Sequence, residues 1–384
     1  MRIGIDLTSI LYHRGVSRYT SNLYRALSQF ETVRLYPYIS CGPRATSLLQ
    51  QELRRLEQTL SSERAHELQK HLCHQSIPPS INHWLWHYLH LNGLSKKMPD
   101  INVFHSWDYL QPPDRQLAVV STIHDLAILK YRQTAHWRIL QHHRESWRIL
   151  KKRQAHIIAV SESTRQDIIN LLEFAPERVH RVYEALPQES FFPPQALKTR
   201  DWKQLKTKFK LEGPYFLFVG TREPRKNLPH LLDAWRALRR NAQLVIVGAK
   251  GWENTVADDP GLHFLEHVTD QELAHLYTHA VALAYPSLDE GFGLPILEGF
   301  AYQTPVITSN RGAMQEIAGQ AAFLVDPLEV DSLREGLEKA LNLTPSERQD
   351  LSNQMKHQLA KFSWEKTARD TLNVYQQAIK EFYA

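Results

Sequence analysis

The chain has 384 residues, a formal net charge of +5, 42% apolar residues and two cysteines. This length exceeds a typical single domain, so we expect two domains of about 150–200 residues each. The apolar content is sufficient for two cores, which excludes global disorder, and no apolar run approaches the roughly 18 residues of a membrane-spanning helix. Cys41 and Cys73 form no disulfide framework or zinc motif, and Met1–Asp6 reads as a strand rather than a signal peptide. We therefore expect a cytoplasmic protein.

The first half of the chain alternates short apolar runs with amphipathic segments. Arg2–Thr8 reads as a buried strand, and the loop His13–Ser17, which carries Gly15, leads into a helix with 3.6-residue periodicity. Strand, glycine loop and helix are the typical opening of a doubly wound α/β domain, in which ligands bind at the carboxyl ends of the strands. His124 directly follows such a strand and is a candidate site residue. The other predicted strands of this half are Val33–Ile39, Val103–His105, Ala118–Ile123, His156–Val160 and Val179–Tyr183.

The α/β alternation restarts after a proline-rich segment that we interpret as a linker. We expect a first domain at 1–190, a linker at 191–204, a second domain at 205–362 and a final helix at 363–384. Two parallel-sheet domains would make the cleft between them the default ligand site. The strands predicted for the second domain are Tyr215–Gly220, Leu244–Gly248, Val281–Tyr285 and Pro305–Thr308.

The most informative motif is EGFGLPILE, in which two glutamates, Glu290 and Glu298, flank a glycine-rich turn. Pro295 suits the first turn of a helix, and the free amides at such a helix start form an anion site, usually for phosphate. These amides would belong to Phe292, Gly293 and Leu294. An anion between two hydroxyl-accepting carboxylates indicates a nucleotide sugar. Glu298 has apolar neighbours, so we expect it to be buried, although a surface position on the helix is the alternative.

Cations for the diphosphate are predicted in the loop after Tyr215–Gly220, which carries Arg225 and Lys226. Arginine offers a planar fork to phosphate oxygens and lysine a point charge. Alone, such a segment is more often a solvated turn, but the helix-start anion site in the same half favours phosphate binding. The sequence has no Asp-x-Asp motif that would hold a metal ion at the diphosphate.

The first half is basic: residues 1–195 contain 24 Lys and Arg against 17 Asp and Glu. Tyr131–Arg153 carries seven of these cations with Trp137 and Trp147, a combination found on helices that lie in lipid headgroups. A solvated helix with inward tryptophans is the alternative interpretation. An anionic membrane surface is thus a candidate partner, and we expect no nucleic-acid partner.

The chain resembles the family-4 group of retaining glycosyltransferases, which have the GT-B fold, over essentially its whole length. The sequence of the Glu-Pro-Arg-Lys-Asn segment is similar to that of the corresponding segment in bacterial mannosyltransferases of polysaccharide assembly. The matching segments are RGVSRYTSNLYRAL, TIHDLA and AVSEST in the first half, and VGTREPRKN, FLEHVTDQELAHLY, YPSLDEGFGLPILEGFA and PVITSNRGAMQEIAGQAAFLVDP in the second.

The resemblance implies a role for each candidate residue. Glu290 would bind hydroxyl groups of the donor sugar and Glu298 the ribose, while Arg225 and Lys226 would hold the diphosphate. His124 would contact the donor sugar near the reacting carbon. Further donor-binding positions would be Gly15, Gly220, Thr221, Phe292, Gly293 and Leu294. The family often has Gly-Arg where this chain has Gly220 and Thr221, so the missing arginine's task would fall to Arg222 or Arg225.

The resemblance also implies two Rossmann-like doubly wound domains facing across a cleft, with the final helix crossing back onto the first. We expect a retaining transferase without metal or other cofactor, which moves a hexose from a GDP- or UDP-linked donor to a lipid-linked or polysaccharide acceptor. The preferred donor is GDP-mannose, from which mannose would be transferred. We also expect the protein to attach peripherally to the inner face of the cell membrane. The alternatives are a nucleotide-sugar epimerase or a phosphorylase on the same fold, or a non-catalytic sugar-nucleotide-binding subunit.

Overall fold

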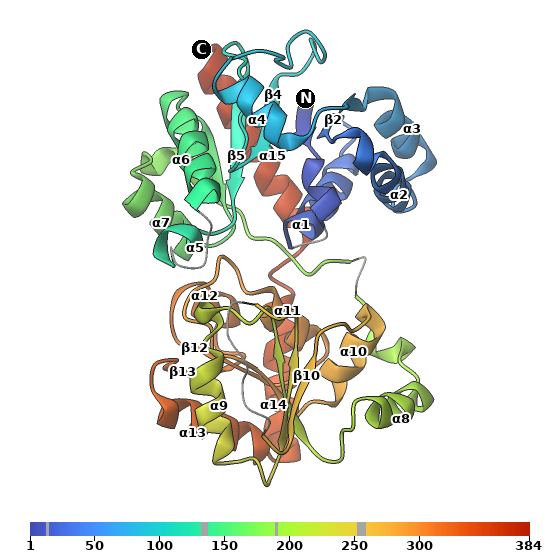
Figure 1. Ribbon diagram of the computed structural model, residues 1–384, viewed down its shortest axis with the longest axis vertical. Helices are drawn as coiled ribbons and strands as arrows, with labels where there is room; N and C mark the ends of the chain where they lie inside the picture. Colours follow the sequence, from blue (N-terminus) through green and yellow to red (C-terminus); the bar gives the residue numbers. More distant parts are fainter. Residues whose placement is uncertain (13–14, 132–136, 189–190, 252–258) are drawn as a thin grey trace. The chain divides into compact units, whose positions relative to one another are not determined.

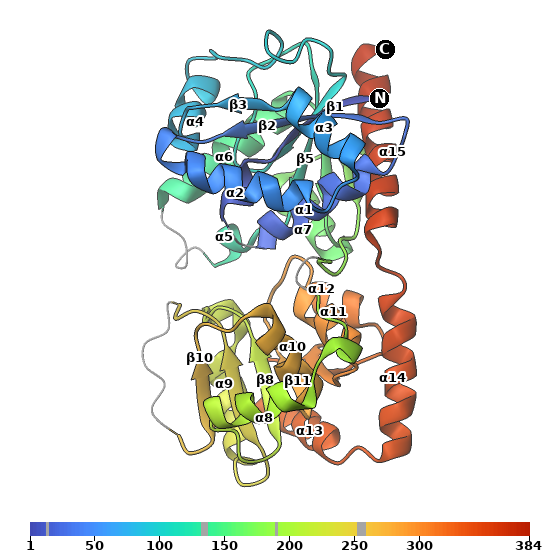
Figure 2. The same ribbon diagram turned by 90° about the vertical axis from the view of Figure 1, so that its right-hand side faces the viewer.

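The computed structural model of the protein describes residues 1–12, 15–131, 137–188, 191–251 and 259–384. They form two compact units, each built on a parallel β-sheet (Figures 1 and 2). The first, here called the N-terminal domain, comprises Met1–Leu129, Ala135–Pro187 and Ser363–Ala384. The second, the C-terminal domain, comprises Lys130–Thr134 and Gln188–Phe362.

The sheet of the N-terminal domain has the strand order β3-β2-β1-β4-β5-β6-β7, and its neighbouring strands pair in parallel. Strands β1 to β3 are added toward one edge of the sheet and β4 to β7 toward the other, so the strand order reverses between β1 and β4. The strands are β1 Arg2–Asp6, β2 Arg34–Ser40, β3 Cys73–Gln75, β4 Val103–Trp107, β5 Ala118–Ile123, β6 His156–Ala159 and β7 Val179–Arg181. Of these, the sequence missed only β3, because this three-residue edge strand has no apolar run.

Helices cover both faces of this sheet (Figures 1 and 2). Helix α1 begins at Gly15, so the predicted loop His13–Ser17 is wrong for its last three residues, and residues 13 and 14 lie outside the described ranges. Ser161 caps α7, accepting a hydrogen bond from the Thr164 amide. The helices are η1 Thr8–Tyr12, α1 Gly15–Ser28, η2 Pro43–Ala45, α2 Thr46–Glu57, α3 Ser62–His71, α4 Pro79–His87, α5 Ala127–Lys130, α6 Trp137–Lys152, α7 Glu162–Leu172 and η4 Pro176–Arg178.

The last helix of the chain, α15 Trp364–Tyr383, packs against α1 and the sheet of the N-terminal domain (Figure 2). Trp364 donates its indole hydrogen to the carbonyl of Leu186 at 2.9 Å, and the Thr367 hydroxyl donates to the carbonyl of Tyr183 at 2.7 Å. Both bonds tie α15 to the segment after β7, because a buried indole or hydroxyl needs such a partner.

The sheet of the C-terminal domain has the order β10-β9-β8-β11-β12-β13, again in parallel, and reverses between β8 and β11. Its strands are β8 Tyr215–Val219, β9 Gln243–Val247, β10 Leu262–Leu265, β11 Ala282–Tyr285, β12 Val306–Ser309 and β13 Phe323–Val325. The sequence missed β10 and β13, which form the two edges and are only partly buried. An edge strand is short and half solvated, so it lacks the continuous apolar pattern of a central parallel strand.

The predicted linker at 191–204 is too long at its end, because α8 begins at Thr199. The last six residues of the predicted linker, 199–204, therefore belong to a helix. The helices of this domain are η5 Pro194–Ala196, α8 Thr199–Lys208, η6 Pro224–Lys226, α9 Leu228–Arg236, α10 Asp270–His279, α11 Leu294–Ala301, α12 Gly312–Ala318, α13 Val330–Leu341 and α14 Pro345–Leu359.

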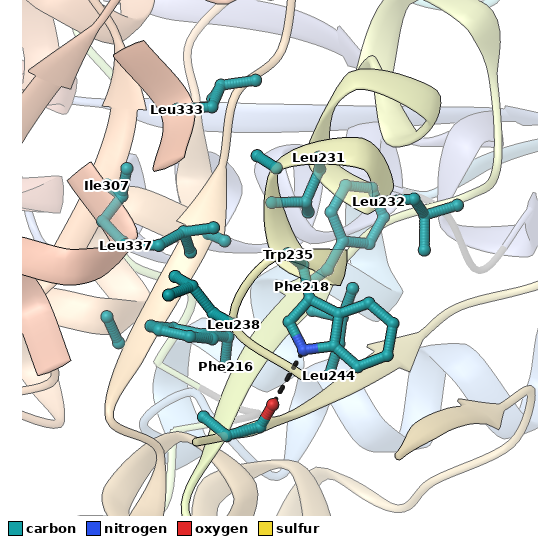
Figure 3. Packing of buried hydrophobic residues seen from close by; sticks show 14 of the residues in the cluster. Phe216, Phe218, Leu231, Leu232, Trp235, Leu238, Leu244, Ile307, Leu333 and Leu337 are labelled. Carbon is teal, nitrogen blue, oxygen red and sulfur yellow. Dashed lines mark hydrogen bonds between the residues drawn. The ribbon is translucent and has the colours of Figure 1, made fainter. Parts of the chain in front are cut away.

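The core of the C-terminal domain fixes the position of β8 relative to α9 (Figure 3). Phe216 and Phe218 of β8 pack with Trp235 of α9 and Leu337 of α13, and the Trp235 indole donates to the carbonyl of Ala242 at 2.8 Å. Burying each large apolar side chain contributes roughly 1.5–3 kcal/mol. The loop between β8 and α9, which carries the predicted cations, is therefore held at both ends by the core.

Across the described ranges, no helix combines the length and the apolar character that crossing a lipid bilayer requires.

Candidate functional site

The candidate site lies where the C-terminal sheet reverses its strand order. Ligands of open parallel sheets bind at this point, beyond the carboxyl ends of the strands. The loop after β8 ends in η6, and the loop after β11 leads to Glu290. The amide of Leu288 donates to the carbonyl of Arg225 at 2.7 Å, and Asn227, with φ +60°, donates its side-chain amide to the carbonyls of Pro286 and Pro327. These bonds join the loops after β8 and β11 to each other and to the segment after β13.

A glycine in the neighbouring loop allows this close packing. A Cβ atom on Gly248 would lie 2.2 Å from the carbonyl oxygen of Gly220, and its φ is +147°. Gly220 itself donates to the carbonyl of Val247 at 2.9 Å. Any side chain at Gly248 would displace the backbone that precedes the cations, so the glycine directly after β9 has a steric reason.

Charged side chains form a cluster between the two loops, in which Lys226 and Glu290 are buried and Arg225 is half-buried and also pairs with Glu223 at 2.9 Å. Lys226 donates to Oε1 of Glu290 at 2.5 Å and to the Tyr285 hydroxyl at 2.7 Å, and Arg225 donates to Oε2 of Glu290 at 2.5 Å. Only 9% of Glu290 and 7% of Lys226 is exposed. Each oxygen of the Glu290 carboxylate thus has its own cation, a charge-assisted arrangement that is stronger than neutral hydrogen bonds.

The cluster determines the charge states of its members. Burial alone would raise the pKa of Glu290, but the charges of Lys226 and Arg225 lower it to about 2. Burial lowers the pKa of Lys226, against the opposing effect of Glu290. Glu290 is therefore an anion at neutral pH, which suits it to accept hydrogen bonds from hydroxyl groups rather than to donate a proton.

The structure distinguishes the two arginines between which the sequence left the choice open. Arg222 pairs with Glu266 at 3.1 Å, and its guanidinium lies 4.9 Å from the centre of the Phe264 ring. It is engaged by residues in and directly after β10, whereas Arg225 contacts Glu290. Arg225, together with Lys226, is thus the arginine of the cluster.

Helix α11 begins at Leu294, where the sequence predicts a helix start. Gly293 precedes it with φ +103°, a conformation that L side chains rarely adopt. Pro295 has no amide hydrogen and the Ile296 amide donates to the carbonyl of Gly293 at 2.9 Å, so in this turn the Leu294 amide is the one suited to an anion. Phe292 is 3% exposed and packs on the Phe362 ring at 5.8 Å. Its side chain is therefore a core residue, and only its backbone is suited to contact a ligand.

Glu298 lies on α11 with a partner that the sequence did not reveal. Tyr277 of α10 donates its hydroxyl to Oε2 of Glu298 at 2.6 Å. The prediction that Glu298 is buried is wrong, since it is half-buried while its neighbours Ile296 and Leu297 are fully buried. The apolar residues of the helix face the core, whereas the Glu298 carboxylate lies on a partly accessible side of the helix and is oriented by the Tyr277 hydroxyl.

Tyr277 and Tyr285 are the polar partners that sequence reasoning missed. Both are buried, and both pKa values are raised well above the usual value, first by burial and then by the neighbouring glutamates. A tyrosine in an apolar helix face or strand is usually read as core. The only available signal was the position of Tyr285, at the end of a strand next to the motif.

His124 lies in the N-terminal domain, directly after β5. Its ring contacts Tyr19 edge to face at 4.7 Å and lies 6.2 Å from the Trp107 ring. Its Nε2 is buried and has no hydrogen-bond partner among the described residues. Burial lowers the pKa of His124, although Asp108 and Asp125 oppose this effect. The side chain is therefore a neutral imidazole with one unused nitrogen.

The remaining predicted positions are dispersed. Gly15 is exposed at the start of α1 in the N-terminal domain, while Thr221 is half-buried in the loop after β8. The structure thus brings Arg225, Lys226 and Glu290 into direct contact. Within the described ranges, no three or more His, Cys, Asp or Glu side chains are arranged to hold a metal ion.

Two family models match the chain: "Glycosyltransferase Family 4" over residues 13–188 and "Glycosyl transferases group 1" over residues 200–358. O-antigen chain mannosyltransferase B of Escherichia coli is 30% identical over 283 residues, which cover 68% of this chain and 71% of that protein. The MMP alpha-(1->4)-mannosyltransferase of Mycolicibacterium hassiacum is 28% identical over 58% of this chain, but the match spans only 54% of that protein. A glycosyltransferase structure from Rickettsia africae has a TM-score of 0.69 at 16% identity, covering 99% of this chain and 98% of that one, and thus shares the fold.

Proposed function

This chain belongs to glycosyltransferase family 4 and has the GT-B fold, and from this premise we propose that it transfers mannose from GDP-mannose with retention of the anomeric configuration. The acceptor would be a lipid-linked or polysaccharide precursor. Mannosyltransferase relatives, one of them named for O-antigen chains, support this choice of sugar and pathway.

The observation that carries the proposal is the contact of Glu290 with Arg225 and Lys226. In the donor complex, the two cations would bind diphosphate oxygens and stabilise the charge that develops on the leaving nucleoside diphosphate. Glu290 would accept hydrogen bonds from hydroxyl groups of the sugar, and Glu298 from those of the ribose. His124, with its unused Nε2, would contact the sugar near the reacting carbon. No enzyme nucleophile and no metal would take part.

A thermal-shift panel with GDP, UDP, ADP and their sugars tests the donor, because ligands that bind the folded state raise its melting temperature. We expect GDP and GDP-mannose to give the largest shifts in melting temperature. A larger shift with a UDP sugar would identify that sugar nucleotide as the donor instead. NMR of the product should show the α configuration of the donor. An epimerised sugar nucleotide, or turnover that depends on inorganic phosphate, would contradict a transferase. Binding without turnover would favour a non-catalytic subunit.

We propose further that α4 and α6 form a surface for anionic membranes. The two helices contact each other through the stacked rings of His83 and His142, 4.0 Å apart. Trp137 of α6 is 63% exposed, whereas Trp147 is buried. The alternative of a solvated helix with inward tryptophans therefore holds for Trp147 only. The other exposed apolar residues on and after α4 are Ile81, Trp84, Tyr88, Leu89 and Leu91, and exposed cations of α6 include Arg144, Arg148 and Lys152.

Arg153 is not part of this surface. Its guanidinium donates to the carbonyls of Pro112, Asp114 and Leu117, so its charge is used inside the N-terminal domain. Flotation with phosphatidylglycerol vesicles should therefore recover the wild type, but less of Trp84→Ser and of Arg144→Glu/Lys152→Glu. Leu328→Ser, which removes an apolar side chain that is 51% exposed in the C-terminal domain, is the matched control. Equal recovery of all four proteins would contradict the surface.

A further inference from the structure

The N-terminal domain contains a cavity of about 240 Å³ at the amino-terminal ends of its strands. It is lined by Ala118 and His156, the first residues of β5 and β6, and by Ala378 near the end of α15. Figure 2 shows α15 running along this domain to the C-terminus. The cavity thus lies at the end of β5 opposite to His124, and the function proposed above does not involve it.

Arg153 places a cation beside this cavity that has no acidic partner. Its guanidinium donates to the backbone carbonyls of Pro112, Asp114 and Leu117, and Leu117 also lines the cavity. No carboxylate among the described residues forms an ion pair with Arg153, and the carboxylate of Asp114 accepts from two backbone amides instead. Neutral carbonyls therefore orient the guanidinium, but its charge is not balanced.

The same cation is partly removed from water. Arg153 is half-buried, and burial lowers its pKa to about 10, although Asp114 opposes this effect. The side chain therefore stays protonated at neutral pH while part of its hydration is lost. A partly desolvated charge without a counter-ion is unfavourable. An anion that enters the cavity would remove this cost, because a guanidinium has more N–H donors than the three carbonyls occupy.

A second arginine of the cavity, Arg178, already has its acidic partner. It pairs with Glu381 of α15 at 3.0 Å and donates to Nε2 of His156 at 3.0 Å. Because arginine can only donate, this nitrogen accepts, and Nδ1 of His156 donates to Nε2 of His180 at 2.8 Å. His156 is therefore neutral, in agreement with a pKa that burial lowers. The charged residues of the lining thus leave one net positive charge, that of Arg153.

The remaining lining is apolar, and the cavity is larger than a single ion requires. Its apolar residues are Leu117, Ala118, Val119, Ala155, Ala378 and Phe382. A dry cavity of about 150 Å³ is large enough for benzene, so this one has room for a ring or a short alkyl chain and its charged group. A phosphate group carries more than one negative charge at pH 7. One arginine fork beside an apolar wall therefore suits a carboxylate better.

We propose that this cavity binds a monocarboxylate with an apolar body, and that the carboxylate lies against the guanidinium of Arg153. The bound molecule would connect the starts of β5 and β6 to the last turns of α15. This site does not rest on the glycosyltransferase function proposed above, because it is separated from His124 by the length of β5.

Isothermal titration calorimetry of the full chain with benzoate and hexanoate tests the site. We expect one molecule of at least one of them to bind per chain, and the Kd to rise at least about tenfold in Arg153→Met, which loses a hydrogen bond to a charged group. Ala378→Leu fills the cavity from α15 without changing its charges, and it should abolish binding. This second variant decides the result if Arg153→Met, which also loses its bonds to carbonyls, does not fold.

Lys380→Gln is the matched control, because Lys380 is an exposed cation of α15 that is not among the described residues lining the cavity. It should bind both carboxylates as the wild type does, whereas neutral benzamide and inorganic phosphate should bind the wild type more weakly than benzoate. Absence of binding by both carboxylates, or an unchanged Kd in Ala378→Leu, would overturn the site. So would equal affinity for benzamide and benzoate, a higher affinity for phosphate, or a loss of binding in Lys380→Gln.

Discussion

The ammonium group of Lys226 lies 2.5 Å from a carboxylate oxygen of Glu290, although 64 positions separate the two residues in the chain. Both are buried, and Arg225 binds the other carboxylate oxygen. Glu223 also pairs with Arg225 at 2.9 Å, so two cations and two carboxylates meet at the reversal point of the C-terminal sheet, where a diphosphate would add its negative charge. The predictions below test this cluster and the positions that support it.

Replacing Lys226 with methionine should separate the function of the cluster from its contribution to stability. The variant keeps the apolar volume but loses the charge proposed to stabilise the leaving diphosphate, so kcat should fall about 10²- to 10³-fold. The matched control is Arg222→Met, which also removes a buried cation from this loop but one that pairs with Glu266. Steady-state kinetics with GDP-mannose should show the large loss in Lys226→Met only. A similar loss in both variants would mean that general disruption of the loop is responsible.

Tyr277→Phe should weaken nucleotide binding through Glu298. The hydroxyl of Tyr277 orients this carboxylate, and losing one hydrogen bond costs about 0.5–1.5 kcal/mol, so calorimetry should show up to about a tenfold rise in the Kd for GDP. Tyr215→Phe serves as the control, because Tyr215 donates to the backbone carbonyl of Leu276 in the same domain. Equal Kd values for Tyr277→Phe and wild type would show that Glu298 needs no such positioning.

Gly248→Ala should destabilise the C-terminal domain and abolish transfer, since the new Cβ would meet the Gly220 carbonyl oxygen at 2.2 Å. Backbone strain of this kind costs about 1–3 kcal/mol of folding free energy. Gly213→Ala is the control, because no atom lies within 4 Å of its Cβ position. Circular dichroism melting should show a lowered Tm for the first variant alone.

Asp6→Asn should stabilise the protein above pH 6. The pKa of Asp6 is raised from 3.8 to about 6 in the folded state, chiefly by burial. The unfolded chain therefore loses this proton first, and stability falls as the pH rises from about 4 to 6. The shift corresponds to roughly 3 kcal/mol. The Tm values of Asp6→Asn and wild type should thus be close at pH 4, with the variant higher at pH 7. Parallel Tm curves across this window would show that the carboxyl does not titrate there.

Much of the architecture follows from local chemistry that the sequence displays. Central strands are buried on both faces and therefore appear as continuous apolar runs, and the start of α11 is recognisable because Gly293 and Pro295 restrict the backbone locally. These features located the loops that carry Arg225, Lys226 and Glu290 before any contact was known. The edge strands β3, β10 and β13 were not visible, because their pairing depends on a neighbour distant in the chain.

Which side chains meet was decided only by the tertiary structure. Arg222 and Arg225 are three residues apart with the same chemistry, yet one turns to Glu266 and the other to Glu290. Asp6 resembles any polar residue at the end of a strand until the packing of Trp107 and Thr8 leaves its Oδ2 without a partner. The sequence by itself determined the residue types and the backbone preferences of each loop. Hydrogen-bond partners and burial depend on segments distant in the chain, so only the folded structure determined the charge states and the unused polar atoms on which the proposed chemistry depends.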